Sequence, residues 1–297
     1  MQHDAIIVGG GFAGLAAATY LARARRRVRV LDTGRPRNRF AEESHGFLGQ
    51  DGSDPLKILA AAREQLLAYP TVKLIEAEAK TARVLDKAFA VGLADGDEIE
   101  ARKLILAFGL RDELPDLPGL KARWGTTVLH CPYCHGIEFS DQELGVLYSS
   151  PLSVHQASLI ADWGPTTLYL NGAELADADA AALAARQVKV EPAPVAGLIG
   201  ERSALSAIEL EDGRRCSTAA LYVAPRSFFN SPLAEHLGAE IDEGPLGPMV
   251  RTDADKMTSV PGLFAAGDIA RMPHSISWAV ADGVTAGTSA HRALVFG

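Results

Sequence analysis

The chain has 297 residues, of which 47% are hydrophobic and 28 are glycine, a composition that suits a soluble enzyme of two domains. Acidic residues outnumber basic ones by 37 to 29, and the net charge of -8 argues against nucleic-acid binding. No apolar run approaches the ~20 residues of a membrane span and no secretory leader pattern is found, so we expect a cytoplasmic protein that does not bind membranes.

A glycine-rich turn follows the first predicted strand, at residues 5–8, and leads into a helix expected over 15–24. Its G-x-G-x-x-G spacing permits a tight turn and lets the backbone approach a pyrophosphate, while the helix N-terminus offers N–H groups to the anion. A second strand, 28–32, ends in an acidic residue that is placed to accept ribose hydroxyls. The residues of this predicted dinucleotide site are Gly9, Gly11, Phe12, Ala13, Gly14 and Asp32.

A pair of cysteines lies mid-chain in the sequence Cys-Pro-Tyr-Cys-His-Gly, at Cys131 and Cys134. Cysteines separated by two residues can close a small, easily reduced disulfide. A zinc site is disfavoured because Cys216 is the only other cysteine and no histidine pair follows at finger spacing. We therefore expect a redox dithiol in a reducing compartment, and no metal site.

The segment after the cysteines alternates predicted strands and helices. Strand 144–148, helix 153–163 and strand 166–170 form a βαβ pattern, and an alanine-rich helix is expected over 177–186. Clusters of proline and glycine precede and follow this part of the chain, at 114–119 and 243–248. The pattern indicates a second α/β unit inserted into the first.

Near the C-terminus, Ser259 to Ile269 reads Ser-Val-Pro-Gly-Leu-Phe-Ala-Ala-Gly-Asp-Ile, and a helix is expected over 275–294. With the glycine turn and a strand at 103–107 followed by Phe-Gly, these motifs resemble the low-molecular-weight thioredoxin-reductase family of flavoproteins over nearly the whole chain. The resemblance implies an α/β fold with two Rossmann-like domains. An FAD-binding domain would comprise 1–117 and 248–297, and the inserted, nucleotide-domain-like unit that carries the cysteines would comprise 118–247.

The resemblance also implies which residues hold FAD. Asp268 after Gly267 would bind the ribityl or phosphate region, and Ser275 and Ile276 would lie beside the flavin pyrimidine, where backbone N–H groups stabilise negative charge. The loop from Arg35 to Leu48 resembles that of FAD-dependent dithiol oxidases of the gliotoxin and holomycin type. There Arg39 or Asn38 could reach the cofactor and His45 could face the flavin ring, although a solvated basic loop is nearly as good an interpretation.

By family position, Cys134 would lie against the flavin and Cys131 would exchange with the substrate sulfur. His135 takes the place of the family's acid–base aspartate, and its ordinary pKa of about 6.5 suits a proton shuttle. His130 is a weaker second candidate, and Cys216 is interpreted as a bystander. The predicted catalytic residues are therefore Cys131, Cys134 and His135.

The inserted unit departs from the family at its nucleotide loop. An NADPH-using thioredoxin reductase would have a second glycine motif after the strand at 144–148, but this chain has Tyr148, Ser150 and Pro151 there. Side chains at such positions block a pyrophosphate, and proline removes an N–H donor. The family's two adjacent arginines are replaced by Asn171-Gly172. We interpret this nucleotide site as lost, while an atypical loop that still binds NAD(P)H remains open.

Three functional hypotheses follow. The first is an NADPH-independent, FAD-dependent dithiol oxidase, the second a thioredoxin reductase with a divergent nucleotide site, and the third a flavin-bound redox sensor. The motif alone does not set the direction of electron flow. Expected partners are a small-molecule dithiol or disulfide or a thioredoxin-like protein, oxygen or another redox partner as electron acceptor, and a second copy of the chain in a homodimer.

Overall fold

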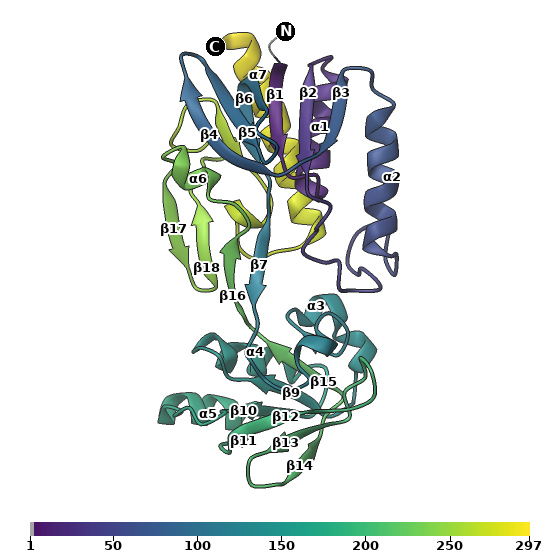
Figure 1. Ribbon diagram of the computed structural model, residues 1–297. Helices are drawn as coiled ribbons and strands as arrows, with labels where there is room; N and C mark the ends of the chain where they lie inside the picture. Colours follow the sequence, from purple (N-terminus) through teal and green to yellow (C-terminus); the bar gives the residue numbers. More distant parts are fainter. Residues whose placement is uncertain (1–2) are drawn as a thin grey trace.

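The computed structural model describes residues 3–297, which form two α/β units stacked end to end and joined by two strands (Figure 1). The larger unit contains both ends of the described chain. Its seven-stranded sheet has the order β3-β2-β1-β6-β5-β4, with β19 paired to β6. These strands are β1 (His3–Val8), β2 (Val28–Asp32), β3 (Val72–Glu76), β4 (Ala79–Leu85), β5 (Ala88–Leu93), β6 (Glu98–Leu106) and β19 (Leu263–Ala265).

Strands β1, β2, β3, β6 and β19 run parallel because helices connect them or cover them, whereas β4, β5 and β6 form an antiparallel meander. The covering helices are α1 (Phe12–Arg23), α2 (Pro55–Leu67) and α7 (Ile276–Phe296). Gly283 and Gly287 of α7 let it pack closely on α1, since a Cβ on Gly283 would lie 2.1 Å from the Ala13 carbonyl oxygen. The two ends of the chain are thereby packed into one core.

The smaller unit has a five-stranded parallel sheet of order β11-β10-β9-β15-β8. One face is covered by α4 and α5, and the other by an antiparallel sheet of β12, β13 and β14. The bounds are β8 (Val128–Leu129), α3 (Pro132–His135), β9 (Leu144–Leu147), α4 (Leu152–Ile160), β10 (Thr166–Tyr169), α5 (Asp177–Ala185), β11 (Lys189–Glu191), β12 (Val195–Ile199), β13 (Ala207–Leu210), β14 (Arg215–Ser217) and β15 (Ala220–Val223).

Two antiparallel strands, β7 (Leu110–Glu113) and β16 (Arg226–Phe229), carry the chain between the units (Figure 1). After β16, the helix α6 (Leu233–His236) and the hairpin of β17 (Ile241–Gly244) and β18 (Gly247–Val250) follow. Leu233 and Val250 belong to the core of the larger unit. The predicted end of the inserted unit at Gly247 does not match this packing, because the proline–glycine cluster there is the turn of a hairpin. We propose that the inserted unit ends near Ala224.

The expected fold class is confirmed: both sheets have the Rossmann-like α/β architecture. In the described part of the chain, no helix is both long and apolar enough to span a membrane.

Candidate active site

The turn between β1 and α1 has the geometry of a phosphate-binding loop. Gly9 adopts φ +113°, and a Cβ there would lie 2.1 Å from the Ala107 carbonyl oxygen. A Cβ on Gly14 would lie 1.8 Å from the carbonyl oxygen of Gly9. Gly11 is different, because its Cβ would meet nothing within 4 Å and it caps α1 without a side-chain hydrogen bond. The space beside the Gly11 Cα lies at the N-terminus of α1, so an anion there could approach the first N–H groups of the helix.

Asp32 lies at the end of β2, beside this turn. Its carboxylate accepts hydrogen bonds from the Arg63 guanidinium at 2.6 Å and from the Gly34 N–H at 3.1 Å. A Cβ on Gly10 would lie 2.5 Å from the Asp32 Cγ, so the second glycine of the turn makes room for this carboxylate. Arg63 and Gly10 were not predicted from the sequence, since neither belongs to the G-x-G-x-x-G spacing.

The C-terminal motif meets the N-terminal turn in space. Gly267 has φ +78°, and a Cβ there would lie 2.9 Å from the Ala13 Cβ. Ser275 caps α7 by accepting the Trp278 N–H at 3.1 Å, and Ile276 begins the helix. Two helix N-termini, of α1 and α7, therefore lie at the carboxyl edge of the larger sheet, where open α/β sheets bind ligands. These residues fit a dinucleotide such as FAD.

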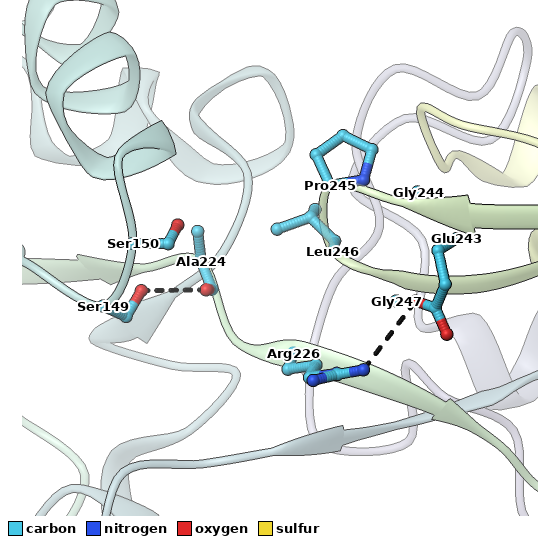
Figure 2. Close-up of a pocket in the computed structure, with 9 residues that line it drawn as sticks. All are labelled: Ser149, Ser150, Ala224, Arg226, Glu243, Gly244, Pro245, Leu246 and Gly247. Atoms are coloured by element: carbon cyan, nitrogen blue, oxygen red, sulfur yellow. Dashed lines mark hydrogen bonds and ion pairs between the residues drawn. The ribbon is translucent and has the colours of Figure 1, made fainter.

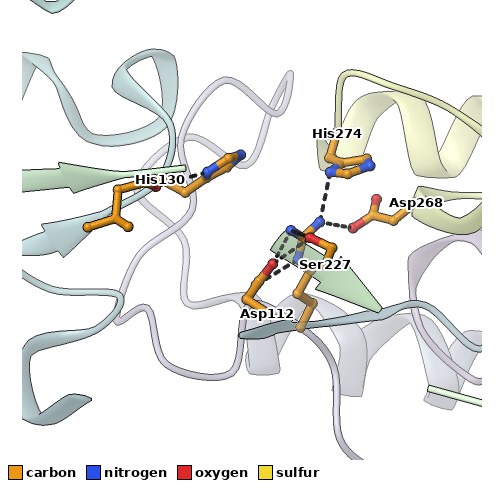
Figure 3. A network of polar contacts seen from close by, with 7 residues as sticks. Asp112, His130, Ser227, Asp268 and His274 are labelled. Atoms are coloured by element: carbon orange, nitrogen blue, oxygen red, sulfur yellow. Dashed lines mark hydrogen bonds and ion pairs between the residues drawn. The ribbon is translucent and has the colours of Figure 1, made fainter. Parts of the chain in front are cut away.

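Arg37 is the centre of a partly buried polar network that sequence reasoning missed. Its guanidinium donates to Asp268 at 2.9 Å and to Ser227 at 3.1 Å, hydrogen-bonds both carboxylate oxygens of Asp112, and lies 2.8 Å from the His274 Nδ1. Figure 3 labels these four partners. Although burial opposes ionisation, the Arg37 hydrogen bond lowers the pKa of Asp112. Because Asp112 and Ser227 lie on β7 and β16, the network ties the predicted cofactor motif to both connecting strands.

Arg39, the arginine predicted to reach the cofactor, is exposed. Its guanidinium lies 4.2 Å from the centroid of the Phe40 ring and donates to the Pro36 carbonyl at 2.9 Å. The structure does not bring it to Asp268. Arginines at 35, 37 and 39 have similar sequence surroundings, so the sequence could not show which of them contacts the cofactor motif. Only the positions of Asp112 and Asp268 in the fold identify Arg37 as that residue.

We predict that Arg37→Gln destabilises the protein strongly. The substitution leaves the carboxylates of Asp112 and Asp268 without their cation. Breaking a fully buried ion pair costs about 3–5 kcal/mol, so we expect a loss of about 2–3 kcal/mol for these partly buried pairs. The exposed Arg39→Gln is the matched control and should change stability by about 0.5 kcal/mol or less. Urea unfolding at pH 7 measures both, and equal effects would show that the network is not a structural centre.

The two cysteines lie at the start of the short helix α3, which faces the larger unit (Figure 1). Cys131 precedes the helix and Cys134 lies within it, with their Sγ atoms 2.7 Å apart. Hydrogen bonding from the Cys134 thiol, followed by the N–H groups of Cys134 and Tyr133, lowers the pKa of Cys131 to about 7. The same contact, together with burial, raises the pKa of Cys134. Cys131 is therefore the sulfur that ionises first.

His135 follows the dithiol and packs against His45, with ring centroids 5.6 Å apart and planes at 88°. Burial lowers the pKa of His135, so the imidazole is neutral at pH 7 and can accept a proton. His45 comes from the loop between β2 and α2, which reaches across to the inserted unit. The structure thus places His45 against a histidine of the dithiol motif.

His130 and Cys216 lie apart from this arrangement. The His130 Nδ1 is 3.2 Å from the Val223 carbonyl oxygen, and burial lowers the pKa of this histidine. The backbone carbonyl of His130 accepts the Gln156 side chain at 2.8 Å. Cys216 lies on β14 and packs against the core beneath the second sheet. These contacts suit structural residues.

The family model for pyridine nucleotide-disulphide oxidoreductases matches residues 3–283. The chain belongs to this family. It is 35% identical to thioredoxin reductase tcpT of Claviceps purpurea, over 98% of this chain and 94% of that protein. Among solved structures it is similar to an oxidoreductase from Agrobacterium tumefaciens, with 43% identity, a TM-score of 0.95 and coverage of 100% and 99%. HlmI is 38% identical, with a TM-score of 0.94 and coverage of 99% and 93%.

These relationships confirm the resemblance to thioredoxin reductases and show a flavin oxidoreductase of that kind. Pyridine nucleotide-disulphide oxidoreductases typically bind FAD, which agrees with the two helix N-termini and the open side of Gly11. The roles of the individual residues remain predictions.

For a pyridine nucleotide-disulphide oxidoreductase, the loop between β9 and α4 is unusual. The Ser153 hydroxyl is fully buried and accepts the N–H groups of Ser149 at 3.0 Å and Ser150 at 3.4 Å. Ser149 in turn donates its hydroxyl to the Ala224 carbonyl at 3.0 Å (Figure 2). The N–H groups that a nucleotide phosphate would need are bonded within the protein. Ser153 was not singled out from the sequence, where a serine after Pro151 reads as an ordinary start of a helix.

A pocket of about 310 Å³ lies beside this loop, between Ser149, Ser150 and the β17–β18 hairpin (Figure 2). Its one cation, Arg226, is 3.7 Å from the Glu243 carboxylate. That carboxylate would repel a phosphate. At the end of β10, the Asn171 side chain accepts the Val195 N–H at 2.9 Å and so links this end of the strand to β12.

The pKa values of the dithiol predict an ordered alkylation. In the anaerobically reduced protein, iodoacetamide should modify Cys131 first, because the thiolate is the reactive form. The lowered pKa makes Cys131 about half ionised near pH 7, so the rate should rise between pH 6 and 8 and then level off. Cys134 should react only at much higher pH. Peptide mapping by mass spectrometry separates the sites, and earlier labelling of Cys134 would reverse the assignment.

Proposed function

We propose that the protein is an FAD-dependent dithiol oxidase that works without NADPH. The observation that carries the proposal is the Ser153 hydroxyl, which accepts the N–H groups of Ser149 and Ser150 in the loop before α4, where a nucleotide phosphate would need free donors. The pairing of the adjacent pocket's one arginine, Arg226, with the Glu243 carboxylate supports it, as does the absence of the paired arginines after β10. The sequence resemblance to dithiol oxidases of the gliotoxin and holomycin type points the same way.

FAD would be held by the Gly9–Gly14 turn, by Asp32 and by Gly267-Asp268, with the start of α7 against its ring. When bound, it supplies the two-electron acceptor that reoxidises the protein dithiol and passes electrons to oxygen or another redox partner.

The residues of the inserted unit carry out the thiol chemistry. A thiolate of the substrate attacks the Cys131 sulfur of the protein disulfide, and the Cys131–Cys134 bond breaks. The second substrate thiol loses its proton to His135 and displaces Cys131, which closes the substrate disulfide and leaves both protein cysteines reduced. The lower pKa makes Cys131 the better leaving group, since low-pKa thiols leave faster.

A thioredoxin reductase is the second candidate, and the name of the Claviceps purpurea relative favours it. In that case the substrate is a thioredoxin-like protein and NADPH supplies electrons. The homodimer expected from the sequence remains a prediction in both cases.

Anaerobic stopped-flow spectroscopy of the FAD-loaded protein distinguishes a dithiol oxidase from a thioredoxin reductase. A small dithiol should reduce the flavin at least about 100-fold faster than NADPH or NADH at equal concentration, because two lost phosphate contacts of about 1.5 kcal/mol each amount to that factor. Cys131→Ser is the control: it should stop reduction by the dithiol and leave any slow reduction by NADPH unchanged. Reduction by NADPH within milliseconds at micromolar affinity would replace the oxidase with a divergent reductase.

A further inference from the structure

Two histidines and a glutamate meet where the loop between β2 and α2 contacts the inserted unit. His45 comes from the loop, and His135 and Glu138 follow the dithiol. Their candidate ligand atoms all lie within 4.8 Å of one another, and no other group of three His, Cys, Asp or Glu side chains in residues 3–297 is as closely spaced. Both imidazoles are partly shielded from solvent.

The spacing already approaches that of a tetrahedral zinc site. With zinc–ligand bonds of about 2.0 Å, adjacent ligand atoms lie about 3.3 Å apart. The His45 Nε2 is 3.5 Å from the Glu138 Oε1 and 3.6 Å from the Glu43 Oε2. The His135 ring nitrogen lies within 4.8 Å of the other two ligand atoms and would have to close toward them.

The surroundings of His45 favour a cation in two ways. Its Nδ1 faces the Asp51 carboxylate at 3.6 Å, and a carboxylate on that nitrogen favours the tautomer whose Nε2 lone pair is free for a metal. Asp51 is itself held by the Gly46 N–H at 2.8 Å. Within the described residues 3–297, the His45 ring is the only basic group in contact with Glu43, Asp51 and Glu138, so no lysine or arginine neutralises these carboxylates.

We propose that His45, His135 and Glu138 bind a zinc ion, with Glu43 or water as the fourth ligand. Two imidazoles and a carboxylate are a ligand set that zinc prefers. The sequence-based expectation of no metal site considered only the cysteines and closely spaced histidines. His45 and His135 are far apart in sequence and meet only in the fold.

The site has a consequence that rests on the proposed function. Zinc would occupy the lone pair with which His135 accepts the substrate proton, and it would join the flavin-side loop to the inserted unit beside the dithiol. Zinc is therefore a reversible inhibitor of dithiol oxidation.

Zinc binding is tested on FAD-loaded protein in which the cysteines cannot contribute. Isothermal titration and equilibrium dialysis are performed with Zn²⁺ on the oxidised wild type and on Cys131→Ser/Cys134→Ser. Both should bind one zinc per chain. His45→Ala and Glu138→Gln in the same background should weaken binding at least about 100-fold, and Asp51→Asn about 10-fold. The exposed His155→Ala is the matched control and should bind as the parent does.

Cobalt substitution provides a second readout that does not depend on any variant. Co²⁺ bound to the oxidised protein should show tetrahedral d–d bands without a thiolate charge-transfer band. Binding that is lost when the cysteines are oxidised or replaced, or that survives His45→Ala and Glu138→Gln, would overturn the proposal. No turnover is measured here, so failure of the oxidase assignment leaves this result unaffected.

Discussion

Replacement of either active-site cysteine by serine should reduce dithiol-driven turnover at least about 1,000-fold, because a hydroxyl cannot form the disulfide that the exchange requires. The two variants should nevertheless differ spectroscopically. In Cys131→Ser, the contact that chiefly raises the pKa of Cys134 is gone, so Cys134 can ionise and give a long-wavelength thiolate-to-flavin absorption band. In Cys134→Ser, the band should be absent if, as we propose, Cys131 faces the substrate and Cys134 the flavin.

Absorption spectra of the two variants, recorded under nitrogen with the flavin oxidised and the remaining cysteine as a free thiol, measure this difference. Cys216→Ser, on β14 of the inserted unit, is the control and should retain both turnover and the wild-type spectrum. A band in Cys134→Ser but not in Cys131→Ser would show that the two cysteines have exchanged roles.

Replacement of Gly11 by valine should remove FAD while leaving the fold intact. Gly11 has an ordinary backbone conformation, with φ −82°, and a Cβ there would meet no protein atom within 4 Å. The added methyl groups would instead fill the space at the N-terminus of α1 where the pyrophosphate is expected. Loss of two phosphate contacts, at about 1.5–3 kcal/mol each, corresponds to an increase of about 100- to 10,000-fold in the Kd for FAD.

Fluorescence titration of the apoprotein with FAD gives the Kd, and circular dichroism checks the fold. Gly11→Ala is the graded control and should have an intermediate Kd. Gly14→Ala should unfold the protein instead, because its Cβ would lie 1.8 Å from a backbone oxygen. A Gly11→Val protein that purifies with its full complement of FAD would disprove the placement of the cofactor.

The features that could be predicted from the sequence are those that depend on residues within a few positions of one another. The Gly9–Gly14 spacing follows from backbone clearances within one turn, and a strand before it and a helix after it complete a unit that needs no distant partner. The loss of the second glycine motif could be read in the same way from Tyr148, Ser150 and Pro151. The order of the predicted α/β elements also indicated the two-unit fold.

The end of the inserted unit shows where local reading failed. The cluster Gly244-Pro245-Leu246-Gly247 has the composition of a domain boundary, but it is the turn of the β17–β18 hairpin, whose strands belong to the larger unit. Proline and glycine mark a change of chain direction. They do not indicate which core the flanking strands join.

The sequence by itself determined the family, the dithiol and the glycine turn, because each depends on residues within a few positions of one another. Only the three-dimensional structure shows that Arg37, and not Arg39, hydrogen-bonds Asp268. It also shows that the Ser153 hydroxyl accepts the N–H groups of its loop, and that the His45 ring packs against His135. Those contacts connect the flavin-side loop, the connecting strands and the inserted unit. The partners of Arg37 and His45 lie far away in the sequence, so no short-range pattern records them, whereas the Ser153 bonds depend on the backbone conformation of its own loop.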